Sequence, residues 1–111
     1  MEDGRTTVVV LRPDASGVAR APGIAEAGCE AVVASLTGED LRTAARAGVV
    51  PFGAGSVRIV RRDTRPARAV AHHLSGRRVP VGVRQEAGTL VVDVAPGDGD
   101  DPVELIELLF G

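Results

Sequence analysis

The chain has 111 residues, of which 44% are hydrophobic and 25% charged, and its formal net charge is −2. This composition predicts one globular domain over residues 1–111 and argues against wholesale disorder, which needs low hydrophobicity and high net charge. The single cysteine, Cys29, excludes an internal disulfide and the paired thiols of a dithiol oxidoreductase.

No apolar run approaches the roughly 20 residues that a bilayer-spanning helix requires. The acidic segment Met1–Arg5 lacks the charged and apolar regions of a signal peptide. We therefore expect a cytoplasmic protein with no membrane contact, and disorder over residues 1–5. The 13 basic residues are all arginine, which together with abundant Ala, Gly and Val suggests a GC-rich bacterial genome.

The first half of the chain predicts one strand and two helices. Residues 6–11 form a continuous β-branched run, which is typical of a strand buried on both faces. Residues 24–36 could form a helix or a strand, and we favour a helix because Ala and Glu dominate. Residues 37–47 predict a helix that begins at Thr37 with an acid three residues later, and residues 49–56 predict a loop.

The second half predicts a strand, a helix, a hairpin and a closing helix. Residues 57–60 alternate in polarity as a strand does, and a helix follows from Asp63 or Thr64 to Gly76. Residues 79–94 predict a hairpin, and residues 101–110 a capped helix. The resulting element order, βα(α)βαββα, predicts an α/β fold in which a mixed sheet has helices on both faces.

The second half also resembles the thioredoxin-like superfamily. The matching features are Asp63-x-x-Pro66 after a strand, Val79-Pro80 before a hairpin, a turn at Gly88 and a final amphipathic helix. The resemblance covers residues 57–110 and implies a single thioredoxin-like domain in which Pro80 is cis. Where that family carries Cys-x-x-Cys, residues 14–19 contain no sulfur, so the resemblance is to a degenerate member without redox chemistry. The hairpin and Asp-Asp-Pro helix are also similar to small α/β adaptor domains associated with actinobacterial effector enzymes.

This resemblance implies a non-redox binding or adaptor module that makes protein–protein contacts, rather than an enzyme, and it implies no cofactor. The implied partner groove combines Ser16 and Gly17 with Val79 and Pro80. The expected partner is a protein, and a homo-oligomer formed through residues 108–110 is an alternative if Phe110 is exposed.

Two other functions are kept as alternatives. The first is a monothiol redox protein that uses Cys29, although Glu26 and Glu30 flank that thiol with the wrong charge to activate it. Among such small apolar neighbours, a lone cysteine is also typical of a core residue.

The second alternative is an anion or nucleic-acid binder in the arginine-rich segment 57–84, through Arg61, Arg62, Arg65 and Arg68. The acidic segment 86–111 could instead neutralise those arginines. The arginine-rich segment has no aromatic residue on which bases could stack, which disfavours a nucleic-acid partner. His72 and His73 are adjacent on the predicted helix, so they cannot easily bind one metal ion, and we predict no metal site.

Overall fold

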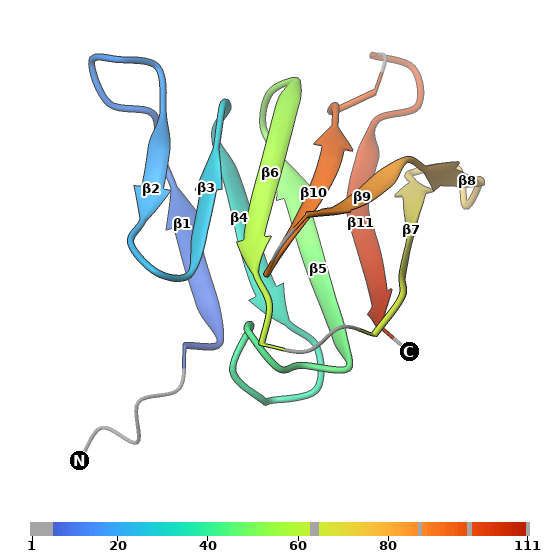
Figure 1. Ribbon diagram of the computed structural model, residues 1–111. Helices are drawn as coiled ribbons and strands as arrows, with labels where there is room; N and C mark the ends of the chain where they lie inside the picture. Colours follow the sequence, from blue (N-terminus) through green and yellow to red (C-terminus); the bar gives the residue numbers. More distant parts are fainter. Residues whose placement is uncertain (1–5, 63–64, 87, 98, 111) are drawn as a thin grey trace.

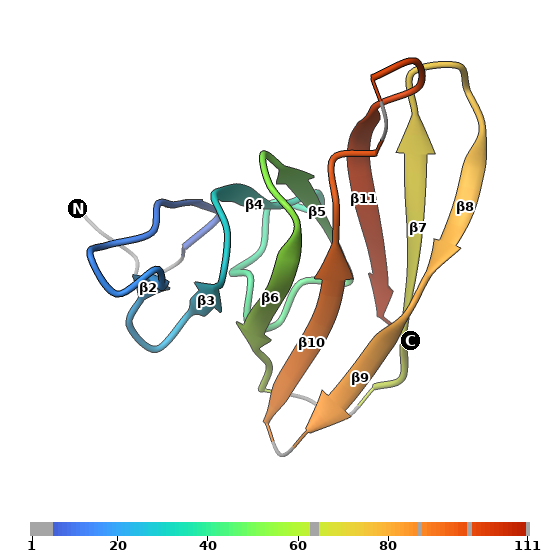
Figure 2. The ribbon, with the colours of Figure 1, turned by 90° about the horizontal axis from the view of Figure 1, so that it is seen from above.

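The structure, a computed structural model, describes residues 6–62, 65–86, 88–97 and 99–110. In these residues the chain forms eleven β-strands and no helix, and the strands make two sheets that face each other (Figures 1 and 2). Sheet A has the order β1-β4-β5-β11-β7-β8 and sheet B the order β2-β3-β6-β10-β9. Each neighbouring pair of these strands is antiparallel.

The strands of sheet A are β1 (Val8–Leu11), β4 (Ala31–Ser35), β5 (Arg46–Pro51), β11 (Val103–Phe110), β7 (Ala67–His73) and β8 (Arg78–Val81). The strands of sheet B are β2 (Ala19–Ala21), β3 (Ala25–Ala27), β6 (Gly55–Val60), β10 (Thr89–Val94) and β9 (Val83–Glu86).

The core lies between the two sheets and consists of small and branched apolar side chains. Because successive side chains of a strand point to opposite faces, every second residue enters the core. One inward row crosses all of sheet A through Val9, Val33, Val49, Ile106, Ala71 and Val79. The facing row of sheet B runs through Ala19, Ala27, Val57, Val92 and Val83.

One side of the sandwich is closed by a ribbon that passes from one sheet to the other. Strand β8 is an edge of sheet A, and strand β9, which follows after Gly82, is an edge of sheet B. Figure 2 shows this ribbon bending from the layer of β7 to the layer of β10.

A buried carboxylate holds the start of β1. The Asp40 side chain accepts a hydrogen bond from Thr6 N at 2.9 Å and one from Arg42 N at 2.8 Å. The Arg42 guanidinium donates to both carboxylate oxygens, at 2.7 and 2.6 Å. These contacts lower the pKa of Asp40 far below its usual range, with the Arg42 side-chain hydrogen bonds as the largest cause.

The predicted α/β fold is wrong, and so are the resemblances to the thioredoxin-like superfamily and to the α/β adaptor domains. The helix predicted over 24–36 is β3 and β4, and the helix over 37–47 is a series of turns that leads into β5. The helix predicted before Gly76 is β7, and the closing helix is β11. The expected parallel strand pair is replaced by antiparallel pairing throughout the described strands.

Several local predictions are confirmed. Residues 8–11 of the first predicted strand form β1, and residues 57–60 lie within β6. The hairpin is confirmed as β9–β10, although its first residues belong to sheet A as β8. Pro80 is trans, since the described residues contain no cis peptide bond. The predicted disorder of residues 1–5 and the helix start at Asp63 or Thr64 lie outside the described residues.

With respect to membranes, the described residues contain no helix with the length and apolar character that crossing a bilayer requires.

Candidate interaction face

The structure does not bring together the four residues of the predicted partner groove. Ser16 and Gly17 lie in the turn between β1 and β2, where Asp14 Oδ1 accepts hydrogen bonds from Ser16 N and Ser16 Oγ. Val79 and Pro80 lie in β8, at the opposite edge of sheet A from β1. The two pairs therefore lie on separate parts of the molecule.

Arg61, the first of the four predicted anion-binding arginines, is a structural residue. Its side chain is buried, and its guanidinium donates hydrogen bonds to the carbonyl oxygens of Leu41 and Ala44, at 2.9 and 2.8 Å. The guanidinium carbon lies 3.6 Å from the centroid of the Phe110 ring. Arg61 thus joins the turns before β5 to the end of β11.

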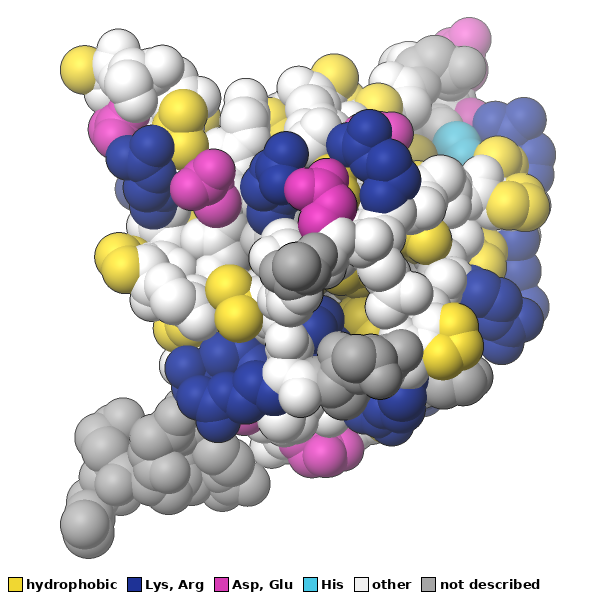
Figure 3. Space-filling model, in the orientation of Figure 1, with side chains coloured by type: hydrophobic (Ala, Val, Ile, Leu, Met, Phe, Trp, Pro, Cys, Tyr) yellow, Lys and Arg dark blue, Asp and Glu magenta, His cyan; other side chains and the backbone are white. Residues whose placement is uncertain are grey.

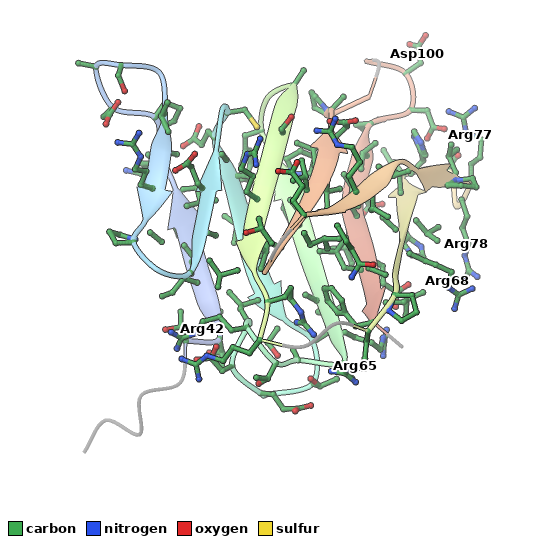
Figure 4. All side chains as sticks on the ribbon, in the orientation of Figure 1. Arg42, Arg65, Arg68, Arg77, Arg78 and Asp100 are labelled. Carbon is green, nitrogen blue, oxygen red and sulfur yellow. The ribbon has the colours of Figure 1, made fainter. Side chains whose placement is uncertain are left out.

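The other three arginines are spread over different surfaces. Arg62 is exposed in the connection after β6, and Arg65 donates a hydrogen bond to Thr43 O at 3.1 Å. Arg68 projects from β7, and Figure 4 shows it close to Arg78 at the β8 edge. The four predicted residues therefore form no single basic cluster.

Part of the arginine-rich segment is neutralised by the acidic segment. Arg58 pairs with Glu86 at 3.3 Å, and Arg77 pairs with Asp101 at 3.4 Å. Both pairs lie on the exposed surface, where an ion pair is worth about 1 kcal/mol or less.

Cys29 lies in the core, and burial raises the pKa of its thiol. A raised pKa lowers the thiolate fraction, which disfavours nucleophilic and redox chemistry. Among the described residues, no group of three His, Cys, Asp or Glu side chains could hold a metal ion.

The outer face of sheet B is charged. One row of paired residues crosses all of its strands, through Arg20, Glu26, Arg58, Val91 and Arg84. Arg20 pairs with Glu26 at 3.3 Å, and Glu86 bridges to Arg58 across β10. Figure 3 shows these alternating basic and acidic side chains across the strands of sheet B. Such a face is well suited to contact with water.

The outer face of sheet A, which we call the A face, has the opposite character. Two rows of residues cross it, and each has a member on every strand. The first row, in which all neighbours are paired, is Val8, Ala34, Gly48, Glu107, Val70 and Pro80. The row beside it contains Val10, Val32 and Val50 on β1, β4 and β5, and Leu105, His72 and Arg78 on β11, β7 and β8.

The half of the A face on β1, β4 and β5 is almost entirely apolar. Val8 and Val10 are 59% and 58% exposed, and Leu36, whose Cδ1 lies 3.6 Å from where a Cβ at Gly48 would be, is 40% exposed. Gly48 has no side chain, which lets Leu105 extend over β5: a Cβ at Gly48 would lie 2.7 Å from Leu105 Cδ1. The result is a broad apolar surface without charge on these strands apart from Arg46 at the start of β5.

The half of the A face on β11, β7 and β8 is basic. Glu107 accepts hydrogen bonds from Arg46 Nε and His72 Nε2, both at 3.0 Å. The Arg46 hydrogen bonds, followed by the His72 bond, lower the pKa of Glu107 and keep it ionised. Arg68 and Arg78 are exposed and make no ion pair with a described acid, so two unpaired positive charges lie on β7 and β8, while the other acid of β11, Glu104, is exposed at the irregularity between Val103 and Leu105.

The sequence contained one signal for the A face. The unbroken run over residues 6–11 predicted a strand buried on both faces, but the structure buries Val9 and Leu11 and exposes Val8 and Val10. The apolar character of both faces of β1 therefore exceeds what this single chain can bury. The basic half was not found because Arg68 and His72 were assigned to a helix that ends at Gly76, which separated them from Arg78.

No protein-family model, curated protein or solved structure matches this chain. The basis for a function is therefore the contrast between the charged outer face of sheet B and the A face.

Proposed function

We propose that this protein is a binding module that makes protein–protein contacts through the A face. The single observation that carries the proposal is the exposure of Val8 and Val10 on a sheet face whose neighbouring strands are also apolar. Extended apolar surface is rare on proteins that bind nothing, because its contact with water is unfavourable.

The size of the A face fits a stable interface. Six strands at spacings of about 4.8 Å, and the length of β11 at about 3.3 Å per residue, give a projected area of about 600 Å². A standard interface removes about 800 Å² of accessible surface from each partner. Because side chains roughen the face, its accessible area exceeds the projected area and comes close to this value.

The chemistry of the A face defines the partner that fits it. The apolar half requires an apolar strip, and the positive charges of Arg68 and Arg78 require carboxylates on one side of that strip. Complementary charge at the rim directs the partner and suppresses wrong ones, while the apolar contact supplies most of the affinity. The partner is therefore a protein surface with an apolar strip flanked by acidic residues.

A second copy of this chain fits the A face less well. In a two-fold symmetric pair the same surface contributes twice. Depending on the direction of the axis, the β7–β8 half would meet either itself or the apolar half of the copy. The first arrangement places arginine against arginine and the second buries arginines against valines, and both are unfavourable.

A peptide titration tests the proposal. The probe is a strand-forming peptide with valines in one half and alternating threonine and glutamate in the other, and its control replaces each glutamate with arginine. Calorimetry should detect binding of the acidic peptide. Val10→Asp should weaken binding more than tenfold, since burying a valine contributes about 1.5–3 kcal/mol. The double variant Arg68→Glu/Arg78→Glu should reverse the preference between the two peptides.

Arg84→Glu on the outer face of sheet B is the control, because it makes one such charge reversal away from the A face and should leave binding unchanged. Equal binding of both peptides, or equal loss in Arg84→Glu, would contradict the proposal. A dimer that dissociates in Val10→Asp during sedimentation would identify a second copy as the occupant. Binding to RNA or to anionic vesicles without peptide binding would identify a different class of partner.

The cytoplasmic location expected from the sequence belongs with this proposal and remains a prediction. It is compatible with Cys29, whose free thiol suits a reducing compartment. Fractionation of the native host cell would test it.

A further inference from the structure

The edge of sheet A that β1 forms has unpaired backbone groups. β1 is the outermost strand and pairs only with β4 (Figure 1). In that pairing Ser35 N donates a hydrogen bond to Thr7 O at 2.7 Å. Because backbone groups alternate in direction along a strand, the N–H and C=O of Val9 also face β4, whereas those of Val8 and Val10 face away from it. No described residue forms a hydrogen bond with the backbone of these two valines.

A turn marks one end of this free edge. The backbone of Thr6 faces the same side as that of Val8 and Val10, but both of its groups are bonded. Thr6 N donates to Asp40 Oδ2, and Thr6 O accepts from Leu41 N, both at 2.9 Å. The open groups beyond this turn are therefore the N–H and C=O of Val8 and of Val10, and such groups are strong donors and acceptors.

Of the four described edge strands, β1 alone contains no charged residue. The other three carry arginine, at Arg20 in β2, Arg78 in β8 and Arg84 in β9. Soluble proteins commonly place charged side chains on edge strands, where they oppose pairing with another chain. The absence of such a charge leaves β1 available to a further strand.

We propose that β1 binds an extended segment of a partner protein by strand addition, at a site that does not depend on the A face proposal. An antiparallel segment would bond all four open groups through two of its residues, one opposite Val8 and one opposite Val10. The side chains of these two residues would lie beside the valines, which are 59% and 58% exposed. Apolar cross-strand pairs stabilise a sheet, so the segment that fits has apolar residues at every second position.

A second copy of this chain fits the edge less well. In a symmetric antiparallel pair centred on Val8 or Val9, a residue of the copy would lie opposite Thr6, where the turn is already bonded. A pair centred on Val10 would place Arg12 of each copy beside Val8 of the other, in place of an apolar pair. A partner segment that ends before Thr6 avoids both arrangements.

Methylation of peptide amides tests strand addition, because it removes hydrogen-bond donors and leaves the side chains unchanged. The probe is a peptide of alternating valine and threonine with a lysine at each end. One version is methylated on the valine amides, which should face β1. The matched control is methylated on the threonine amides, which should face solvent. In calorimetry the unmodified and control peptides should bind equally, and the valine-methylated peptide at least tenfold more weakly.

Variants of the protein give a second measurement. Val10→Pro removes one donor of the edge and should weaken binding of the unmodified peptide about tenfold. It should fold, because the lost N–H faces away from β4 and proline is tolerated at such edge positions. Val10→Ala keeps the N–H and should weaken binding less. Arg68→Glu/Arg78→Glu should leave binding unchanged, because the probe contains no acid and the two arginines lie near the opposite edge of sheet A.

Three results would overturn this proposal. They are no binding of the unmodified peptide at millimolar concentration, equal binding of the two methylated peptides, and a dimer of the free protein that dissociates in Val10→Pro. The last result, detected by sedimentation, would identify a second copy as the occupant of the edge. The methylated peptides keep the test decisive if Val10→Pro does not fold. The A face is tested with a different, acidic peptide and by charge reversal at Arg68 and Arg78, so the two proposals fail separately.

Discussion

The guanidinium carbon of Arg61 lies over the Phe110 ring, 3.6 Å from its centroid, and the guanidinium donates hydrogen bonds to two carbonyl oxygens of the turns before β5. A cation on an aromatic face that is also satisfied by carbonyl oxygens can be buried at modest cost. The chain has only two aromatic residues, and one of them therefore supports a buried charge as well as filling the core.

Replacing Arg61 with lysine should destabilise the fold by about 2–3 kcal/mol, because an ammonium cannot reach both carbonyl oxygens and stack on the ring at once. Phe110→Leu should cost less, about 1–2 kcal/mol, since it keeps much of the apolar volume. Denaturant unfolding of the single and double variants measures the coupling between them. Additive effects would show that the two side chains act independently.

The Asp40 cluster predicts loss of stability in acid. The folded-state pKa of Asp40 is lowered from its ordinary value of 3.8. The contribution of Asp40 to the stability of the fold is therefore complete above pH 3.8. This stabilisation decreases as the pH falls below 3.8, because the unfolded chain takes up the proton before the folded protein does. Asp40→Asn should flatten the acid limb of the stability curve, and Asp40→Ala should cost about 2 kcal/mol at neutral pH. If the acid limb is unchanged in Asp40→Asn, the loss of stability in acid is caused by other carboxylates.

Two glycines with similar backbone angles provide a matched test of how tightly the loop between β10 and β11 is packed. Gly97 and Gly88 have φ of +80° and +72°. A Cβ at Gly97 would lie 3.1 Å from both Asp101 O and Val103 N, whereas at Gly88 its nearest neighbour is Arg61 O at 4.0 Å. Gly88→Ala should cost about 1 kcal/mol for the left-handed conformation alone. Gly97→Ala should cost about 1–2 kcal/mol more, and equal costs would show that the loop can move aside.

Gly48 and Leu105 should be coupled on the A face. Alanine is favoured over glycine in a strand by about 0.5–1 kcal/mol. In Gly48→Ala this gain is offset, because Leu105 must leave its position over β5. In a Leu105→Ala background the full gain should appear in thermal unfolding. If Gly48→Ala has the same effect in both backgrounds, Leu105 does not depend on the glycine.

The Cys29 thiol should react slowly in the native protein. It is 6% exposed, and burial raises its pKa. Alkylation by iodoacetamide should proceed at the rate of a free thiol only after denaturation. Fast alkylation of the folded protein, with a pH profile centred below that of free cysteine, would instead support the monothiol alternative.

The sequence was sufficient to predict strands that have one polar, solvent-exposed face. Residues 57–60 alternate Val57 and Ile59 with Arg58, and the β9–β10 hairpin has a glycine-containing turn, so both could be predicted. Period-2 alternation is visible when one face of a strand is polar.

The sequence was misleading where both faces of a strand are apolar. On β11, Ile106, Leu108 and Phe110 are inside, but Leu105 and Leu109 on the A face are also apolar, and this hides the alternation. On β7 the spacing of Ala67, Val70 and Ala71 matches a helix, whereas the structure places Ala69 and Ala71 inside and Val70 outside. Long-range pairing thus outweighed the local preference of an alanine-rich segment. The apolar outward residues that form the A face are therefore the same residues that hid the strand pattern in the sequence.

The two edges of sheet A differ in their capacity for further growth. The outermost strand β8 contains Pro80 and Arg78, which oppose the addition of another strand, whereas β1 contains neither. Two molecules that join edge to edge would do so through β1 and would then present a blocked strand at both ends. Such an assembly terminates at a pair, so this sheet cannot seed a fibre.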